Sequence, residues 1–228
     1  AVVIDREIAT LPAGLTVYRA ADARAALAAL SAAYFGFPAR ELLTVGVTGT
    51  KGKTTTTHMI RALLEKGGIP TGLIGTNGIT IGREHIATKN TTPESYEIQE
   101  SFRKMADAGC KAVVMEVSSQ GLMLHRTGSI LFDYGIFMNI TPDHIGPNEH
   151  KTFEEYLFWK SQLFCSAGQG LSMRMMCTLS TLKRWQSARS CTVSAKKIRR
   201  TLRSAGSLTR QIPTLSACAL ILQAQGGK

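Results

Sequence analysis

The stretch from Val45 to Thr57, VGVTGTKGKTTTT, constrains the fold of this chain more than any other. It starts within an apolar run over 42–47 that is typical of a buried strand, and after a glycine-rich turn it enters a helical pattern over 55–66. In such a strand–turn–helix, glycines let backbone N–H groups face an anion, and the helix N-terminus adds partial positive charge. The stretch therefore predicts a phosphate-binding loop.

Two side chains after the turn define the chemistry of this loop further. Lys53 can reach the β- and γ-phosphates of a nucleotide, and the Thr54 hydroxyl can bind Mg²⁺. The common motif has its first glycine where Val47 stands here, so the loop is a variant of that motif. A glycine-rich turn with a chance Gly-Lys-Thr is the alternative, but the flanking strand and helix favour the phosphate loop.

The length and hydropathy of the chain fit a protein of one or two domains. It has 228 residues and no run of 18 consecutive apolar residues, so no transmembrane helix is expected. Residues 1–5 lack the basic region of a secretory signal, and we therefore expect a cytoplasmic protein.

The net charge of +11 is concentrated in one part of the chain. Residues 1–164 contain 16 Lys and Arg and 16 Asp and Glu, whereas residues 165–228 contain 11 Lys and Arg, no acid and four of the five cysteines. Globular domains normally mix both signs of charge. We therefore expect a boundary after Phe164, followed by a basic tail that is poorly ordered.

Residues 1–41 are too short to form a core of their own. Apolar runs at 2–4 and 16–18 predict two short strands, and Asp22 is a suitable N-cap for a helix over 23–35. We expect this segment to be the end of a small α/β domain that packs on the residues after it.

Strands and helices alternate between residues 42 and 164. Further strands are predicted at 71–76, 112–117 and 136–138, a hairpin at 77–87, and helices at 94–108, with Thr92 as N-cap, and at 152–164. This alternation predicts an α/β domain with a mostly parallel sheet covered on both faces. In such sheets ligands bind at the carboxyl ends of strands, where we place Glu116, His144 and the phosphate loop.

Glu116 is an acid within an apolar strand pattern. An unpaired carboxylate there is unfavourable, and a bound Mg²⁺ compensates for it; an exposed strand edge or a structural ion pair are the alternatives. Several other polar residues also have ordinary interpretations: surface positions for His144, His125 and Arg126, a helix cap for Thr91 and Thr92, and a solvated helix lysine for Lys160.

Five motifs occur in an order that resembles the Mur ligases of bacterial peptidoglycan synthesis. They are TGTKGKTT from Thr48, NTTP from Asn90, EVSSQGL from Glu116, NITPDH from Asn139 and EYLFWKSQLF from Glu155. The resemblance covers roughly residues 1–164 and is greatest for the branch that adds the third residue of the stem peptide. The combination is far more specific than any one motif.

The resemblance implies an ATP-dependent, ADP-forming amide ligase. Such an enzyme joins an amino acid to UDP-N-acetylmuramoyl-L-alanyl-D-glutamate through an acyl phosphate. It implies ATP and Mg²⁺ as cofactors, the UDP-muramoyl-dipeptide and an amino acid as partners, and a cytoplasmic monomer without nucleic-acid or membrane partners. It also implies roles in cell wall synthesis, cell shape and cell division.

The resemblance assigns roles to individual residues. The phosphate contacts are Gly49, Thr50, Gly52, Lys53, Thr54 and Thr55. The metal ligands are Thr54, Glu116, His144 and Lys160, the last as a carbamate, and the catalytic residues are Lys53, His144 and Lys160. The contacts to the muramoyl-dipeptide are Thr91, Thr92, Ser118 and Arg126. The family often has a glutamine at the position of Leu124, so one substrate contact is missing here.

The complete family enzyme has three domains. Residues 1–41 match only the end of its N-terminal UDP-binding domain, 42–164 match part of its central ATP-binding domain, and 165–228 resemble neither the rest nor the amino-acid-selecting C-terminal domain. A frame-shifted reading explains the tail, because shifting the codons of 173–177 restores aspartates. A nucleic-acid or membrane arm around the basic run 196–200 is the alternative. Sequencing the DNA after the Phe164 codon distinguishes them.

Because these domains are largely missing, we expect little or no ligase turnover from the chain itself. A non-catalytic ATP-binding fragment is therefore one alternative, and a ligase of the folylpolyglutamate synthase type is another. Glu116-Val-Ser-Ser followed by His125-Arg126 favours the muramoyl-peptide branch. The residues present do not specify which amino acid is added.

Overall fold

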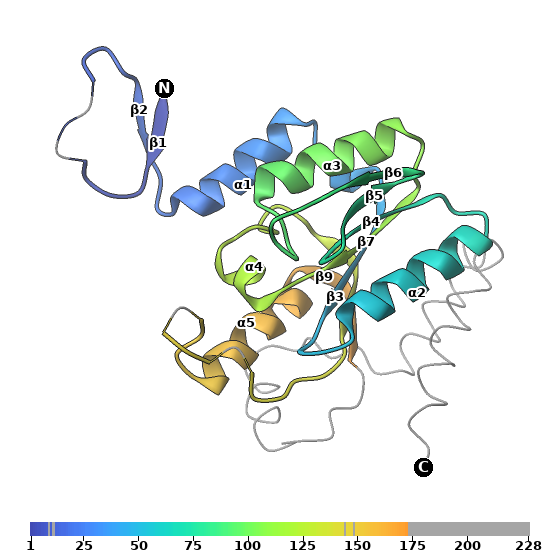
Figure 1. The fold of residues 1–228 in the computed structure, drawn as a ribbon. Helices are drawn as coiled ribbons and strands as arrows, with labels where there is room; N and C mark the ends of the chain where they lie inside the picture. The colour runs from blue at the N-terminus through green and yellow to red at the C-terminus, as the bar shows by residue number, and fades with distance from the viewer. Residues whose placement is uncertain (9, 11, 144, 148, 173–228) are drawn as a thin grey trace.

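A seven-stranded sheet in the order β6-β5-β4-β7-β3-β8-β9 forms the centre of the molecule (Figure 1). The structure is a computed structural model that describes residues 1–172 except 9, 11, 144 and 148. The strands are β3 (Leu43–Thr48), β4 (Thr71–Gly75), β5 (Gly78–Ile81), β6 (Glu84–Ile86), β7 (Ala112–Glu116), β8 (Phe132–Phe137) and β9 (Ala167–Ser172). Strands β4, β7, β3, β8 and β9 run parallel, while β5 and β6 form an antiparallel hairpin at one edge. The predicted mostly parallel α/β sheet is confirmed.

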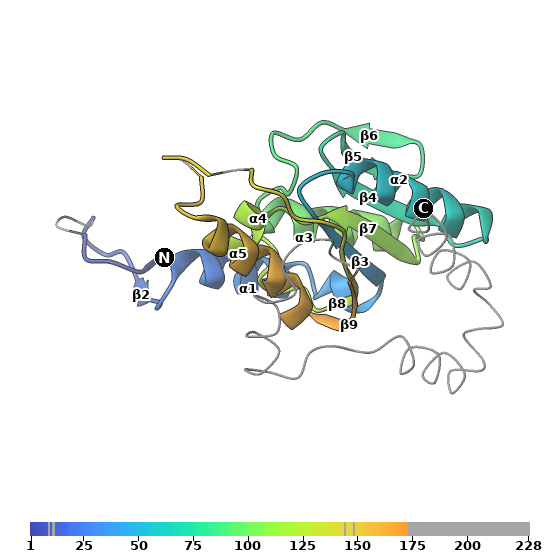
Figure 2. The same ribbon diagram turned by 90° about the horizontal axis from the view of Figure 1, so that it is seen from below.

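Helices cover both faces of this sheet (Figure 1, Figure 2). They are α1 (Ala23–Tyr34), α2 (Lys53–Lys66), α3 (Ser95–Asp107), α4 (Ser119–Met123) and α5 (Phe153–Cys165), with a 3₁₀ turn at Pro38–Arg40. On β7, Ala112 and Val114 pack in the core with α2, whereas Val113 and Met115 pack in the core with α3 and α5. This alternation is the period of two that a strand buried on both faces requires.

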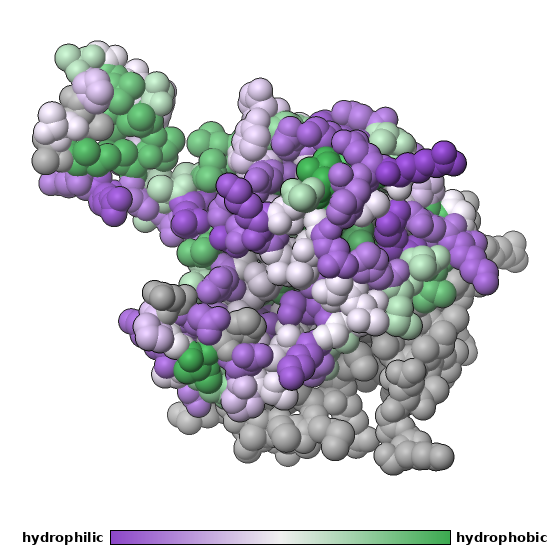
Figure 3. Space-filling view, viewed as in Figure 1, coloured by the Kyte–Doolittle hydropathy of each residue, from purple (hydrophilic) through white to green (hydrophobic). Residues whose placement is uncertain are grey.

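The N-terminal segment projects from the body of the molecule (Figure 1). Strands β1 (Val2–Ile4) and β2 (Val17–Arg19) form a separate parallel pair, and α1 lies between this pair and α3. Asp22 caps α1 as predicted, since its side chain accepts a hydrogen bond from the Ala25 N–H. The space-filling view shows apolar side chains on this projection (Figure 3), and Tyr18 and Tyr34 are both exposed.

The helix predicted over 94–108 starts later than expected. Glu94 is its N-cap, with a capping box to Glu97, and the prediction that Thr92 caps it is wrong. Thr92 is fully buried, and its hydroxyl donates instead to the backbone carbonyl of Glu116 at the end of β7. Helix α4 and strand β9 were not predicted from the sequence.

Helix α5 and strand β9 continue past the expected boundary after Phe164. Cys165 ends α5, and β9 pairs in parallel with β8 from Phe132↔Ala167 to Phe137↔Ser172. The expected boundary after Phe164 therefore does not coincide with the end of the sheet. The frame-shift hypothesis concerns the tail 165–228, and residues 173–228 of it lie outside the described residues. No helix in the described part of the chain is long and apolar enough to cross a membrane.

Candidate nucleotide-binding site

The carboxyl ends of four adjacent strands form the candidate site. Val47 near the end of β3 lies opposite Glu116 on β7 and Ile136 on β8, and β4 lies on the other side of β7. Because these strands are parallel, the loops that follow them emerge at one edge of the sheet. The phosphate loop is central in this row, as the sequence predicted.

Two glycines shape the phosphate loop. Gly52 is the N-cap of α2 and has φ +83°, a left-handed conformation that other residues rarely adopt. A Cβ on Gly49 would lie 3.1 Å from the Met138 side chain, so the loop approaches the segment after β8 closely. Lys53, Thr54 and Thr55 then form the first turn of α2, where helix N–H groups are available to an anion.

Asn139, two residues after the end of β8, fixes the loop from the other side. Its Oδ1 accepts hydrogen bonds from the N–H groups of Thr50 and Lys51, both at 3.1 Å, and its Nδ2 donates to the Lys51 carbonyl. The Thr50 hydroxyl accepts from the Thr141 N–H at 3.0 Å and lies 3.1 Å from the Tyr156 hydroxyl. These bonds hold the phosphate loop against a segment that lies 88 residues or more further along the chain.

Two lysines converge on one carbonyl oxygen. Lys53 Nζ donates to Gly49 O at 2.9 Å and to Thr50 O at 3.2 Å, and Lys160 Nζ donates to the same Gly49 oxygen at 2.8 Å. Lys160 comes from α5, is 2% exposed and lies 4.7 Å from the centre of the Tyr156 ring. It is therefore not the solvated helix lysine that was the alternative.

Burial makes both lysines easier to deprotonate. Burial, together with the charge of Lys53, lowers the pKa of Lys160 to about 7, against the smaller opposing effect of Asp143. Burial also lowers the pKa of Lys53, against the effects of Glu116 and Asp143. At neutral pH a large share of Lys160 is a neutral amine, which is the nucleophilic form.

Glu116 is a buried carboxylate that several donors hold. It is 1% exposed at the end of β7, a central strand, so the exposed-edge alternative is wrong. Thr54 Oγ1 donates to Oε1 at 2.9 Å, and the Thr76 N–H donates to the same oxygen at 2.9 Å. No ion pair to Glu116 occurs among the described residues. The carboxylate and the Thr54 hydroxyl thus share one location beside the loop.

The predicted substrate contacts gather on the other side of Glu116. Thr92 Oγ1 donates to the Glu116 carbonyl at 3.0 Å and accepts from the Ser118 N–H at 3.0 Å. Arg126 Nη1 donates to the Thr92 carbonyl at 3.0 Å, and its Nη2 lies 2.8 Å from Glu94. Thr92 is buried and acts on the backbone, whereas Thr91, Ser118 and Arg126 are only half-buried.

Several residues of this site had no individual role predicted from the sequence. One residue that was predicted, His144, is not among the described residues. Asn139 and Asp143 belong to the NITPDH motif, and that motif was their signal. Thr76 had none, because its contacts depend on the pairing of β4 with β7.

The fit of a metal can be judged from the donors present. Within the described part of the chain, no three His, Cys, Asp or Glu residues group together. The Thr54 hydroxyl and the Glu116 carboxylate are nevertheless adjacent hard oxygen donors beside a phosphate loop, which is the usual setting for a nucleotide-bound Mg²⁺ that keeps several waters. These residues therefore fit Mg²⁺ bound together with a nucleotide.

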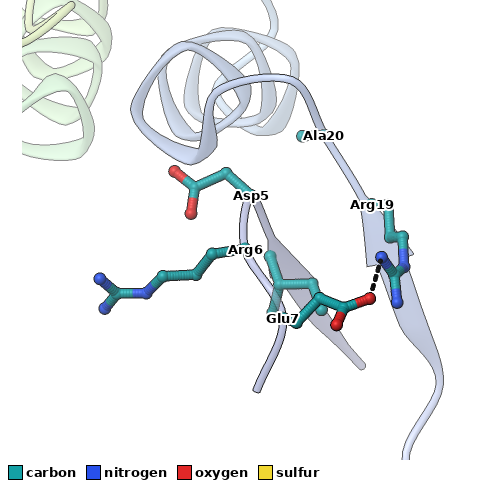
Figure 4. Close-up of a pocket in the computed structure, with 6 residues that line it drawn as sticks. Asp5, Arg6, Glu7, Arg19 and Ala20 are labelled. Atoms are coloured by element: carbon teal, nitrogen blue, oxygen red, sulfur yellow. Dashed lines mark ion pairs between the residues drawn. The ribbon is translucent and has the colours of Figure 1, made fainter. Parts of the chain in front are cut away.

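A hollow on the N-terminal projection is separate from this site (Figure 4). Its lining includes Asp5, Arg6, Glu7 and Arg19. Arg19 lies 3.5 Å from Glu7, and both side chains are largely exposed, so this pair contributes little. None of the predicted site residues lines it.

A family model decides the relationship of this fold. The Mur ligase middle domain matches residues 47–202, more than half of the chain. The chain belongs to the Mur ligase family. The match also continues past Phe164. The family resemblance therefore extends beyond residues 1–164, to which it was expected to be confined.

Curated relatives of the Mur ligase family support this assignment. A UDP-N-acetylmuramoyl-L-alanyl-D-glutamate–2,6-diaminopimelate ligase of Clostridium perfringens is 47% identical over 161 residues, which are 71% of this chain and 33% of that protein. A UDP-N-acetylmuramyl-tripeptide synthetase of Bifidobacterium longum is 44% identical over 161 residues, 70% of this chain and 31% of that protein. The chain thus spans about a third of the length of these relatives.

Solved structures of Mur ligase relatives share the fold. A UDP-N-acetylmuramoyl-L-alanyl-D-glutamate–2,6-diaminopimelate ligase matches with a TM-score of 0.67 at 23% identity, over 82% of this chain and 38% of that one. A folylpolyglutamate synthase of Mycobacterium tuberculosis, complexed with ADP and AMPPCP, matches with a TM-score of 0.57 at 16% identity, over 73% and 45%. At these identities the likeness concerns the fold alone.

Proposed function

We propose that this chain is the nucleotide-binding part of a ligase that adds an amino acid to UDP-N-acetylmuramoyl-L-alanyl-D-glutamate, with ATP converted to ADP and phosphate. The two curated relatives carry names of this activity or of its product, at 44–47% identity. The proposal includes a cytoplasmic, monomeric, Mg²⁺-dependent protein of cell wall synthesis, with the consequences for cell shape and division that this implies.

One observation carries the proposal. Two helices and one strand bring their polar side chains together around the phosphate loop. Lys53 and Thr54 lie on α2, Lys160 lies on α5, and Glu116 lies on β7. This arrangement suits a phosphoryl transfer, in which positioning and charge stabilisation supply most of the catalysis. Lys53 would hold the β- and γ-phosphates of ATP, with Gly49, Thr50, Gly52 and Thr55 around them.

Thr54 and Glu116 would hold a nucleotide-bound Mg²⁺, and His144 would help to hold a second Mg²⁺. When bound, Mg²⁺ neutralises charge on the phosphates. Glu116 meanwhile keeps the Thr54 hydroxyl oriented through their 2.9 Å hydrogen bond. The buried carboxylate is favourable only with such partners.

Lys160 fits the carbamylated lysine of the family. Its lowered pKa leaves a neutral amine at pH 7, which can attack CO₂ and lose a proton to give a carbamate. The modification changes the sign of the Lys160 charge, so that repulsion by Lys53 becomes attraction. The carbamate would then be a further oxygen donor beside the phosphate loop.

The chemistry proceeds in two displacements. A substrate carboxylate oxygen attacks the γ-phosphorus and the bond to ADP breaks, giving an acyl phosphate. The incoming amine then attacks the acyl carbon, and phosphate leaves. Thr91, Ser118 and Arg126 would orient the muramoyl-dipeptide for this, and buried Thr92 would support the loop that carries them.

Product formation tests the proposal. We expect the chain, incubated with ATP, Mg²⁺, UDP-N-acetylmuramoyl-L-alanyl-D-glutamate and either diaminopimelate or lysine, to bind nucleotide but to form little tripeptide product by mass spectrometry. A protein that spans the full length of these relatives should form it. A product with pteroyl-glutamate substrates and none with the muramoyl-dipeptide would instead support a folylpolyglutamate synthase.

A further inference from the structure

Thr76 follows β4 directly and contacts the Glu116 carboxylate twice. Its backbone N–H donates to Oε1 at 2.9 Å, and its hydroxyl donates to Oε2 at 3.3 Å. The Thr54 hydroxyl donates to Oε1 as well, at 2.9 Å. The carboxylate is therefore held at both oxygens, from the end of β4 and from the start of α2.

Gly75 provides the space for this arrangement. A Cβ at this position would overlap Glu116 Oε1. Gly75 and Thr76 thus form a seat for the carboxylate, in which the glycine leaves room and the threonine supplies two donors. Thr76 is itself exposed, so this seat lies on the open side of the site.

The same threonine also determines the direction of a second hydrogen bond. Thr76 Oγ1 and Thr91 Oγ1 lie 3.0 Å apart, and either atom could donate in that bond. The single hydroxyl proton of Thr76 is used on Glu116, which is acceptor-only when ionised. The proton between the two threonines therefore comes from Thr91, and the Thr91 oxygen can only accept from a bound molecule.

We propose that Thr76 is a positioning residue that fixes the Glu116 carboxylate for a nucleotide-bound divalent cation and makes Thr91 a hydrogen-bond acceptor toward the peptide substrate. The proposal rests on the proposed function, since a metal–nucleotide at the loop is what the orientation of Glu116 serves. One hydrogen-bond chain, Thr54–Glu116–Thr76–Thr91, then connects the nucleotide side with the substrate side.

Binding of Mn²⁺ to the full chain in saturating ADP, followed by electron paramagnetic resonance, tests the positioning role. Thr76→Val should weaken Mn²⁺ binding about ten-fold, the usual cost of losing a residue that orients a metal ligand. Thr76→Ser keeps both donors and should bind as the wild type does. Thr80→Val is the matched control, because Thr80 lies in the adjacent hairpin and bonds to His85 instead.

The hydrogen-bond chain predicts coupling as well. Thr91→Val should weaken Mn²⁺ binding about two-fold in the wild-type background and not at all beside Thr76→Val, because the connection is already broken. Equal Mn²⁺ affinity of Thr76→Val and wild type would overturn the positioning role, and equal effects of Thr91→Val in both backgrounds would overturn the chain. Failure of the wild type to bind Mn²⁺ with ADP would overturn the proposed function and this inference together.

Discussion

At the scale of single residues, Lys160 occupies the most unusual environment. The ordinary lysine pKa is 10.5, and burial next to Lys53 lowers it to about 7 in the folded chain. Between these two values the unfolded chain binds more protons than the folded chain, so the contribution of Lys160 to stability rises with pH from 7 to 10.5. Below pH 7 Lys160 is charged in the folded chain as well, so burying this charge lowers the free energy of unfolding by its full amount.

Lys160→Met should therefore stabilise the chain most at low pH. We expect its advantage over wild type in the free energy of unfolding to shrink by about 2–4 kcal/mol between pH 6.5 and pH 10. Denaturant unfolding in CO₂-free buffer measures this, and the difference between the two proteins removes the titration of all other groups. A difference that does not vary with pH would show that Lys160 is charged throughout this range.

Gly75→Ala tests the seat of Glu116 with a single methyl group. Because the added Cβ overlaps Oε1, the carboxylate must move, and we expect Mn²⁺ binding in the presence of ADP to weaken by about ten-fold or more. Gly146→Ala is the control, since a Cβ there meets nothing within 4 Å. Equal binding by both variants would contradict the placement of Glu116.

At the scale of elements, one carboxylate connects α1, α3 and the loop after α4. Glu94 caps α3 and lies 2.8 Å from Arg126 and 3.3 Å from Arg24 on α1. The Arg126 side chain is 11% exposed, and its Nε has no partner among the described residues. Arg126 therefore depends on Glu94 more than a surface arginine would.

Glu94→Gln should lower the free energy of unfolding by about 1–2 kcal/mol, because it leaves the half-buried guanidinium without its counter-charge. Glu7→Gln breaks the exposed Arg19–Glu7 pair and should change stability by about 0–0.5 kcal/mol. Thermal or urea unfolding of the two variants checks the contrast. Equal losses would mean that the position of Arg126 does not depend on Glu94.

Sequence patterns predicted most elements but not the contacts between them. The phosphate loop, α2 and β7 are specified by local periodicity, glycines and capping residues, so their positions could be predicted. The contacts of Thr76 and Asn139 depend on which strands lie side by side, and no local pattern carries that information. Thr92 matched a helix N-cap, but its hydroxyl bonds to the end of β7, which only the folded sheet supplies.

At the scale of the whole molecule, composition and fold divide the chain differently. Residues 165–228 contain no acid, yet β9 continues the sheet to Ser172 and the family match continues to residue 202. Charge content could not predict this, because β9 carries no charged residue and its pairing with β8 is a backbone interaction. In contrast, the strand, glycine-rich turn and helix around the phosphate loop follow one another as predicted.

Calorimetric titration of ADP into the full chain tests most directly whether this site binds a metal–nucleotide. Binding should be tighter with Mg²⁺ than with EDTA, and both Lys53→Met and Glu116→Gln should weaken the Mg²⁺-dependent binding, each by about ten-fold or more. Gly146→Ala should bind as the wild type does. ADP binding that is unaffected by EDTA and by both substitutions, or no binding by the wild type, would contradict the account.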